Sequence, residues 1–517
     1  MFQQHRPNVF QMSLGNIPPH ETITIEINYT ELLTPTSGVY EFVYPTVVGP
    51  RYNGEIVKDE GWISNPYANL EESNLSAPVF DIRVMLSAPI PLQGVSTTSH
   101  RTKVQYTSER EAVIQLANNG NSEQKDFILH YKLAGNDMQT GITLYEGDDE
   151  NFFLYIGQSP ERVEPEQIPD REYFFIIDVS GSMQGFPMDI SKSLIKELLS
   201  GLNPNEKFNV MLFASSSSVY SKKPVSATKK NIKKALNFIT SNNTSGGTNM
   251  LSAIKKAYSM IDDKSSTSMV ILTDGYVTVD KEVFAFIENN LNHANFFPFG
   301  IGSSVDRHLI EGIAHCGQAQ PFIVTSKSEA AKTAKAFCEY IRSPVLTDVK
   351  VAFDGLDVYD LSPVNQPDLF AEKPVVVYGK WRGRPSGNVT LTGVSGAGEY
   401  ENTIRVSDDN RDPLQSGLKY LWARNKLKHL SDYQSVSHDP ELKKEITELG
   451  LRYSLLSKFT SFIAIDEESN IVEQDELIID NTGAAPEPHE WALIIFGAIF
   501  LILILHWQSR LSSSPII

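Results

Sequence analysis

Residues 173–183 read YFFIIDVSGSM, an apolar run that ends in an aspartate and a serine-rich turn. Near-continuous apolar strands that alternate with amphipathic helices are typical of a parallel sheet covered by helices on both faces. We therefore predict a multidomain chain with a doubly wound, Rossmann-like α/β domain at residues 171–343, whose ligands would bind at the carboxyl ends of the strands. The further apolar runs that support this prediction lie at residues 208–214, 269–274, 294–302 and 321–325. The helices expected between them cover residues 188–202, 229–240, 251–261, 281–291, 307–315 and 328–341.

The sequence on either side of this domain favours strands. Residues 1–165 hold short alternating runs separated by Pro, Asn, Gly and Ser clusters, so we expect an all-β region there. The strand pattern returns after Pro344 and predicts a β-sandwich-like region over 344–410. The segments expected after it are a helical region with a closing strand (411–470), an acidic stalk (471–490), a transmembrane helix (491–507) and a tail (508–517).

Composition excludes several classes of protein. At 517 residues the chain is long enough for roughly three or four domains. Its 63 acidic residues outnumber 45 basic ones, which gives a net charge of −18 that disfavours nucleic acid as the main partner. Cys316 and Cys338 are too few for a disulfide scaffold, and they would form either a single bridge or two buried thiols. The absence of CxxC and Cys/His clusters from the sequence excludes zinc and redox motifs.

An apolar run near the C-terminus, from Trp491 to Leu505, carries no charge and no proline. With Trp507 at its far border it predicts a membrane-spanning helix, and the alternative is a buried core helix. Because acidic residues precede the run and Arg510 follows it, the positive-inside rule places residues 508–517 in the cytoplasm and the bulk of the chain outside. The N-terminus has no signal peptide, which favours either a tail-anchored cytoplasmic protein or a chain that lacks its true beginning.

Hydroxyl and carboxylate side chains lie where the expected strands end. Asp178, Ser180 and Ser182 share the turn after the first strand, Thr248 lies in SGGTN, and Asp274 lies in LTDG. This all-oxygen set suits a hard cation, with Mg²⁺ expected and Mn²⁺ or Ca²⁺ as alternatives. In the competing interpretation the hydroxyls cap helices and the aspartates are turn residues. That interpretation explains each residue singly but not their convergence on one sheet edge.

The DVSGSM motif with Thr248 and Asp274 resembles the metal-ion-dependent adhesion site of von Willebrand factor A domains. The resemblance implies that Ser180, Ser182 and Thr248 contact Mg²⁺ directly or nearly so. It implies that Asp178 and Asp274 act mainly through water, and that an acidic side chain of the ligand completes the coordination shell.

Other motifs resemble inter-alpha-trypsin inhibitor heavy chains and their bacterial relatives. HRPNVFQMSLGNIPPHETITIEINYTELL (5–33) is similar to the C-terminal half of a vault protein/inter-alpha-trypsin (VIT) domain, which implies that residues 1–50 are the end of such a domain and 51–165 a further β-rich region. Since that domain starts well upstream in the family, we expect the chain to lack its true beginning. Two departures limit the resemblance, because Asp439-Pro440 is not followed by the His-Phe of the glycosaminoglycan-linkage motif and no LPxTG sortase signal occurs. The downstream resemblance is carried by SPVLTDVKVAFDG (343–355), LKYLWARNKLKHL (418–430) and LRYSLLSKFTSFIAID (451–466).

These observations favour a membrane-anchored, outward-facing adhesion protein that captures an acidic group of a protein or polysaccharide through the metal. The alternative is a scaffold or assembly factor of the cell envelope that uses the α/β domain for a dedicated partner. We find no convincing nucleophile–base pair and therefore predict no enzyme activity and no catalytic residue. A basic cluster would dock an acidic polymer or, in the simpler interpretation, form a solvated helix face; it consists of Lys222, Lys223, Lys229, Lys230, Lys233 and Lys234.

Overall fold

The computed structural model describes the α/β domain almost completely, together with strands before it and strands and helices after it. The described residues are 2–6, 9–12, 24, 26, 31–36, 38–45, 81–117, 125–133, 138–160, 168–241, 246–261, 265–275, 281–341, 343–371 and 373–461. The closing strand was expected at 461–466, and all of it after Ser461 lies outside the described residues, as do the acidic stalk, the apolar segment 491–507 and the tail.

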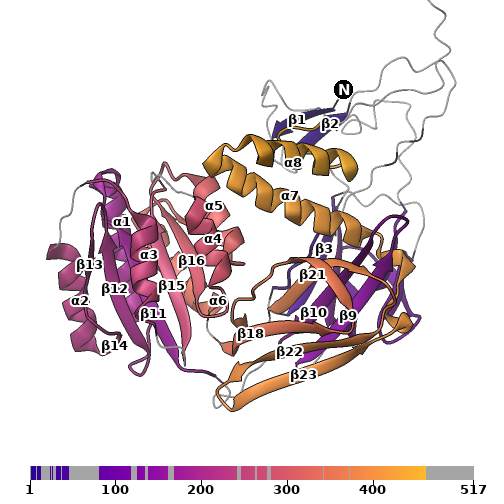
Figure 1. Cartoon of the computed structure of the whole chain (residues 1–517), viewed down its shortest axis with the longest axis horizontal. Helices are drawn as coiled ribbons and strands as arrows, with labels where there is room; N and C mark the ends of the chain where they lie inside the picture. Colours follow the sequence, from indigo (N-terminus) through magenta and orange to yellow (C-terminus); the bar gives the residue numbers. More distant parts are fainter. Residues whose placement is uncertain are drawn as a thin grey trace, which may run out of the picture. The chain divides into compact units, whose positions relative to one another are not determined.

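A seven-stranded sheet forms the centre of the α/β domain, in the order β13-β12-β11-β15-β16-β17 with β14 paired to β12 (Figure 1). The pairs among β12, β11, β15, β16 and β17 are parallel, whereas β13 and β14 run antiparallel to β12 at the edge. The strands are β11 (Arg171–Asp178), β12 (Lys207–Phe213), β13 (Ser217–Val219), β14 (Val225–Ser226), β15 (Ser266–Thr273), β16 (Asn295–Ile301) and β17 (Phe322–Val324).

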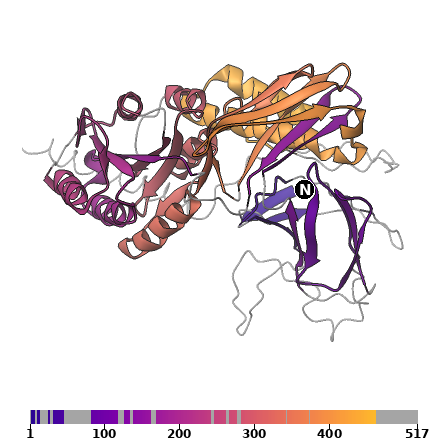
Figure 2. The same ribbon diagram turned by 90° about the horizontal axis from the view of Figure 1, so that it is seen from below.

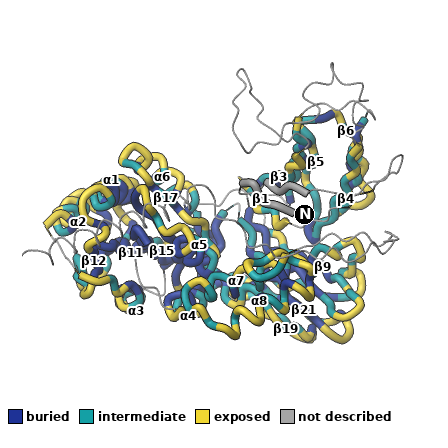
Figure 3. The backbone as a smooth tube through the Cα atoms, turned by 90° about the horizontal axis from the view of Figure 1, so that it is seen from above, coloured by how far each residue is buried: buried dark blue, intermediate teal, exposed yellow. Residues whose placement is uncertain are grey.

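Helices cover both faces of this sheet, which confirms the doubly wound α/β prediction. The apolar sides of α1 (Phe186–Ser200), α2 (Lys229–Ser241) and α6 (Lys327–Tyr340) pack into one core. The apolar sides of α3 (Met250–Tyr258), α4 (Lys281–Asn289) and α5 (Arg307–Cys316) pack into a second core on the opposite face. Strands β11 and β15 are buried between these layers, while the outer sides of the helices are exposed (Figure 3).

The two cysteines lie on opposite faces of the sheet and are both free thiols. Cys316 is buried in the core of α3, α4 and α5, whereas Cys338 packs against the core of α1, α2 and α6. Because the sheet separates them, a disulfide between them would require a rearrangement of the domain.

Strands from both sides of the α/β domain build a β-sandwich. One sheet has the order β19-β21-β10-β9 and the other β20-β18-β22-β23 (Figures 1 and 2). Their apolar side chains share one core. From sequence, residues 51–165 and 344–410 were expected to be separate regions, but β10 pairs with β21 along its whole length. The strands are β9 (Gln139–Glu146), β10 (Asn151–Gln158), β18 (Pro344–Asp354), β19 (Asp357–Ser362), β20 (Leu369–Phe370), β21 (Pro374–Arg382), β22 (Gly387–Ser395) and β23 (Gly398–Val406).

The N-terminal part consists of short antiparallel strands, as the all-β pattern predicted. Their sheets have the orders β1-β2, β3-β8-β5 and β4-β7-β6. The strands are β1 (Phe2–Arg6), β2 (Val9–Met12), β3 (Val39–Tyr44), β4 (Arg83–Ser87), β5 (Leu92–Thr97), β6 (Thr102–Tyr106), β7 (Glu111–Leu116) and β8 (Phe127–Leu133).

Two helices follow the sandwich, α7 (Gly417–Ser437) and α8 (Pro440–Arg452). His438 takes a left-handed φ of 52° between them, and the Asp439 carboxylate accepts a hydrogen bond from the backbone N–H of Glu441 at 3.0 Å. Asp439-Pro440 is thus a helix N-cap followed by a proline in the first turn, an arrangement common at helix starts. No helix among the described residues is long and apolar enough to cross a membrane.

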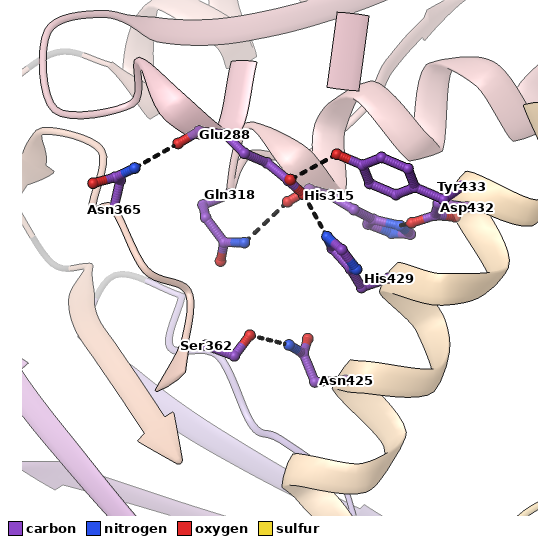
Figure 4. A network of polar contacts seen from close by, with 9 residues as sticks. All are labelled: Glu288, His315, Gln318, Ser362, Asn365, Asn425, His429, Asp432 and Tyr433. Atoms are coloured by element: carbon purple, nitrogen blue, oxygen red, sulfur yellow. Dashed lines mark hydrogen bonds and ion pairs between the residues drawn. The ribbon is translucent and has the colours of Figure 1, made fainter. Parts of the chain in front are cut away.

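Polar contacts connect α7 to the α/β domain (Figure 4). Glu288 of α4 accepts a hydrogen bond from the Tyr433 hydroxyl at 2.8 Å and lies 2.8 Å from His429 Nε2. In a second pair the histidine belongs to the α/β domain and the acidic residue to α7. His315 Nδ1 of α5 lies 2.9 Å from Asp432 Oδ2 of α7. The helical pattern of the sequence predicted α7 but did not indicate these contacts.

Candidate metal centre

Asp178 is the last residue of β11 and lies at the carboxyl edge of the parallel sheet. The register places it beside Phe213 of β12 on one side and next to the end of β15 on the other. Its side chain is fully buried. Oδ1 accepts from the Ser180 backbone N–H at 2.9 Å, and Oδ2 accepts from the Thr273 hydroxyl at 2.8 Å. Both carboxylate oxygens are therefore held in place by neighbouring donors.

The turn after β11 holds the two serines together. Ser180 is 2% exposed, whereas Ser182 is exposed to solvent, and their hydroxyl oxygens lie 3.2 Å apart. The backbone forms a short 3-10 turn over Gly181–Met183, and the Met183 side chain is buried beneath it. This buried anchor fixes the turn, so that Ser182 can face solvent while Ser180 stays next to Asp178.

Asp274 follows directly after β15 and is 4% exposed. Its carbonyl accepts a hydrogen bond from the Asp306 backbone N–H at 3.1 Å, at the start of α5. The next residue, Gly275, has a φ of +86°, and a Cβ there would lie 2.8 Å from the Asp306 Cβ. Only glycine fits this close approach, which keeps Asp274 at the sheet edge.

Thr248 lies at the same edge, on the segment that leads into α3. The neighbouring Asn249 donates its backbone N–H to the carbonyl of Ala214, just after β12, at 2.9 Å. The Asn249 side chain also accepts from Ser252 N at 3.1 Å and caps α3. Among the described residues no hydrogen bond joins the Thr248 hydroxyl to Asp178, Ser180, Ser182 or Asp274.

Two acidic groups lie close together at this edge. Burial of Asp178 raises the pKa of its carboxyl, and the charge of Asp274 raises it further, while hydrogen bonds from Ser180 and Thr273 counteract part of the shift. Within the described part of the chain, no Lys, Arg or His lies within ion-pair distance of Asp178. Because a buried carboxylate is costly without a compensating charge, a cation at this edge would stabilise Asp178.

The donor set fits a hard cation better than zinc. Hydroxyl and carboxylate oxygens suit Mg²⁺, Mn²⁺ or Ca²⁺, whereas zinc prefers His and Cys ligands. The described residues contain no group of three or more His, Cys, Asp or Glu side chains that could hold a metal. If a cation binds here, serine and threonine hydroxyls must therefore provide part of its coordination.

Thr273 is a residue of this candidate site that the sequence motif did not indicate. It donates to Asp178 Oδ2 and accepts from the Gly275 backbone N–H at 3.1 Å, so it links the two aspartate-bearing strand ends. The sequence held a signal for it, because a threonine follows the apolar run 269–272 immediately before Asp274.

Comparison with known proteins agrees with the α/β fold. Residues 172–320 match the von Willebrand factor type A domain family, so the chain contains a domain of that type. A von Willebrand factor A domain-containing protein of Dictyostelium discoideum is 23% identical over 475 residues, which are 90% of this chain and 48% of the relative. Mouse inter-alpha-trypsin inhibitor heavy chain 4 is 23% identical over 494 residues, which are 89% of this chain and 50% of the relative.

An enzyme is also among the relatives. Mouse protein mono-ADP-ribosyltransferase PARP4 is 23% identical over 487 residues, and the alignment covers 90% of this chain but 24% of that protein. This chain spans about half the length of the first two relatives and a smaller share of PARP4. The similarity thus covers nearly the whole chain, but it leaves most of the ADP-ribosyltransferase unmatched.

Proposed function

We propose that this chain is a binding protein that captures an acidic group of a protein or polysaccharide through a divalent cation at the edge of its von Willebrand factor A domain. The observation that carries the proposal is the buried Asp178 beside Asp274, with no basic side chain of the described residues in ion-pair distance of Asp178. A binding role also agrees with the type of domain that the family match identifies.

The five edge residues would have different roles in coordinating the cation. Asp178, Ser180 and Asp274 are buried and would supply the protein side of the coordination shell. Ser182 is exposed and Thr248 half-buried, so they would border the side that faces a ligand. The cation, Mg²⁺ or alternatively Mn²⁺ or Ca²⁺, would supply an open coordination position for an external carboxylate.

The proposal includes a membrane location for the chain. The apolar segment 491–507 would anchor the chain in a membrane, with the binding domain on the extracytoplasmic side and residues 508–517 in the cytoplasm. The β-sandwich and α7 would then support the binding domain, because β18 of the sandwich directly follows α6 and α7 contacts α4 and α5.

The test is calorimetric titration of Mg²⁺ and Mn²⁺ into the full chain. We expect saturable binding in the wild type and its loss in Asp178→Asn, which keeps the size of the side chain but removes its charge. Asp189→Asn is the matched control, because Asp189 lies in the first turn of α1 and pairs with Lys327 on the surface at 2.9 Å. Its binding curve should equal that of the wild type.

Either of two results would contradict the proposal. One is a folded wild type that binds neither cation, and the other is an Asp178→Asn variant that binds them with wild-type affinity. Circular dichroism and the urea midpoint of each variant distinguish loss of the site from loss of the fold.

A further inference from the structure

Charge is unevenly distributed in this chain. Between residues 207 and 261 the sequence contains nine lysines, no arginine and no aspartate or glutamate, although the whole chain carries a net charge of −18. A segment of this length without an acidic residue is unusual in so acidic a protein. It covers β12 to α3, which is the β13 and β14 edge of the α/β domain.

Six of these lysines are exposed on the segment from β13 to α2, where Asn231 of α2 donates a hydrogen bond to the Ser226 carbonyl of β14 at 2.9 Å; these six are here named the lysine edge. Four lie on the first two turns of α2, and two lie between β13 and β14. Among the described residues, none of the six has a carboxylate within ion-pair distance. The lysine edge consists of Lys222, Lys223, Lys229, Lys230, Lys233 and Lys234, all exposed.

The placement of these charges is unfavourable for α2 itself. Lys229 and Lys233 are four residues apart on the helix, as are Lys230 and Lys234, and like charges at this spacing repel. They also lie near the N-terminal end, where the helix dipole favours acidic residues. Elsewhere the same spacing carries opposite charges, as in the Lys335–Glu339 pair of α6 at 3.9 Å and the Lys444–Glu448 pair of α8 at 4.0 Å. An anionic ligand would relieve the repulsion on α2.

The chemistry of the surface narrows the class of ligand. Ala235 and Ile239 of α2 are buried, and Ile232, Leu236 and Phe238 pack against the same core. In the described part of this edge, between residues 207 and 241, no large hydrophobic side chain is exposed. A stable protein partner would use apolar anchors, and a membrane-bound helix would insert apolar side chains. Lysine also presents a point charge rather than the planar fork of arginine, which suits distributed anionic groups.

We propose that the lysine edge binds a linear acidic polysaccharide, whose sulfate or carboxylate groups are spaced along a hydrophilic chain. This surface is separate from the metal centre, because Lys222 and Lys223 lie before β14, which pairs with the start of β12, whereas the metal centre lies at the carboxyl ends of β11 and β15. Binding here therefore does not require the cation.

The experiment measures binding of the full chain to a heparin oligosaccharide and to a polygalacturonate oligosaccharide. The variant replaces Lys229, Lys230, Lys233 and Lys234 with glutamine, which has a similar helix propensity. The control removes the same number of charges from α6 and α8 through Lys332→Gln, Lys335→Gln, Lys443→Gln and Lys444→Gln. Both variants are also tested for binding to phosphatidylserine vesicles, and all measurements are repeated with EDTA and at two salt concentrations.

We expect the α2 variant to bind both oligosaccharides at least about tenfold more weakly, since several surface charge contacts are lost together. The control should retain its affinity, added salt should weaken wild-type binding, and EDTA should leave it unchanged. Equal losses in both variants, no effect of the α2 variant, or loss with EDTA would overturn the proposal. If the α2 variant loses binding to vesicles but keeps its binding to the oligosaccharides, the lysine edge is a membrane-binding surface and the proposal is overturned. Failure of the metal titration leaves this result unaffected, so the two proposals fail independently.

Discussion

At the scale of single residues, the metal centre depends on how one buried carboxylate is held. Asp178 has a donor on each oxygen, and one of them is the hydroxyl of Thr273. That hydroxyl also accepts from the backbone of Gly275, so a single side chain connects the ends of β11 and β15. Thr273 would thus orient Asp178 without contacting the cation itself.

Replacing Thr273 with valine should weaken both the site and the fold. Valine has nearly the same shape but leaves Asp178 Oδ2 and the Gly275 N–H without this partner, at a cost of about 1–3 kcal/mol in the free energy of unfolding. We also expect roughly tenfold weaker Mg²⁺ binding, because the carboxylate is no longer oriented. Urea denaturation and calorimetry measure the two effects. Thr273→Ser keeps the hydroxyl and should restore both values; a serine variant as impaired as the valine variant would contradict this role.

At the scale of elements, a buried ion pair ties the sandwich to the helices that follow it. Lys380 of β21 is 5% exposed and lies 2.7 Å from Glu150, which precedes β10. Glu150 also accepts from the Tyr453 hydroxyl after α8, and Arg452 lies 3.2 Å away. The Lys380 ammonium is 3.7 Å from the centre of the Trp422 ring on α7. Four segments therefore meet at one charged cluster: β21, the residue before β10, α7 and the end of α8.

This cluster makes stability depend on pH. Burial alone would raise the pKa of Glu150, but hydrogen bonds from Lys380 and Tyr453 and the charges of Lys380 and Arg452 outweigh it and lower the pKa. A carboxyl whose pKa is lowered in the folded state stabilises the fold at pH values above the ordinary glutamate pKa of about 4.3. This stabilisation is lost as the pH falls below that pKa and through the lowered pKa of the folded state.

Glu150→Gln should be destabilised most at neutral pH. Removal of the carboxylate leaves the buried Lys380 with Asp360, 3.6 Å away, as its remaining acidic partner, which costs about 1–3 kcal/mol at pH 7. The difference from the wild type should shrink as the pH falls from about 5 to 3, because the wild type then loses the charge as well. Urea midpoints across this range measure it.

The control is Glu146→Gln, because Glu146 forms an exposed pair with Arg411 at 2.7 Å. Exposed pairs contribute about 0–1 kcal/mol, so this variant should follow the wild type at every pH. A Glu150→Gln deficit that stays constant down to pH 3 would show that the charge of Glu150 is not what stabilises the cluster.

At the scale of the whole molecule, local periodicity predicted the elements far better than their pairing. The helices from α1 to α6 lie where the apolar spacing placed them, with ends that differ by a few residues. The pairing of β10 with β21 was not predictable, because antiparallel partners more than two hundred residues apart leave no local pattern. Likewise, the five edge residues were proposed from a sequence motif. The role of Thr273 depends on tertiary structure, as do the contacts of His315 with α7 and of His429 with α4.

The state of the cysteines follows from the layered architecture. Cys316 and Cys338 lie on opposite faces of the sheet, so we expect two thiols in the native protein. Alkylation in denaturant without reductant, followed by mass spectrometry, should add two alkyl groups, and dithiothreitol should leave the melting temperature unchanged. Full alkylation that requires prior reduction would show a bridge and contradict the placement of these residues.

The central claim is that a cation binds among Asp178, Ser180, Ser182, Thr248 and Asp274. The most direct measurement is the anomalous scattering of Mn²⁺ in crystals of the protein grown with that ion. The account predicts a single strong peak at the carboxyl edge of the sheet, with serine or threonine oxygens about 2.0–2.3 Å away. A folded protein whose crystals show no peak there, or whose only peak lies elsewhere, would contradict it.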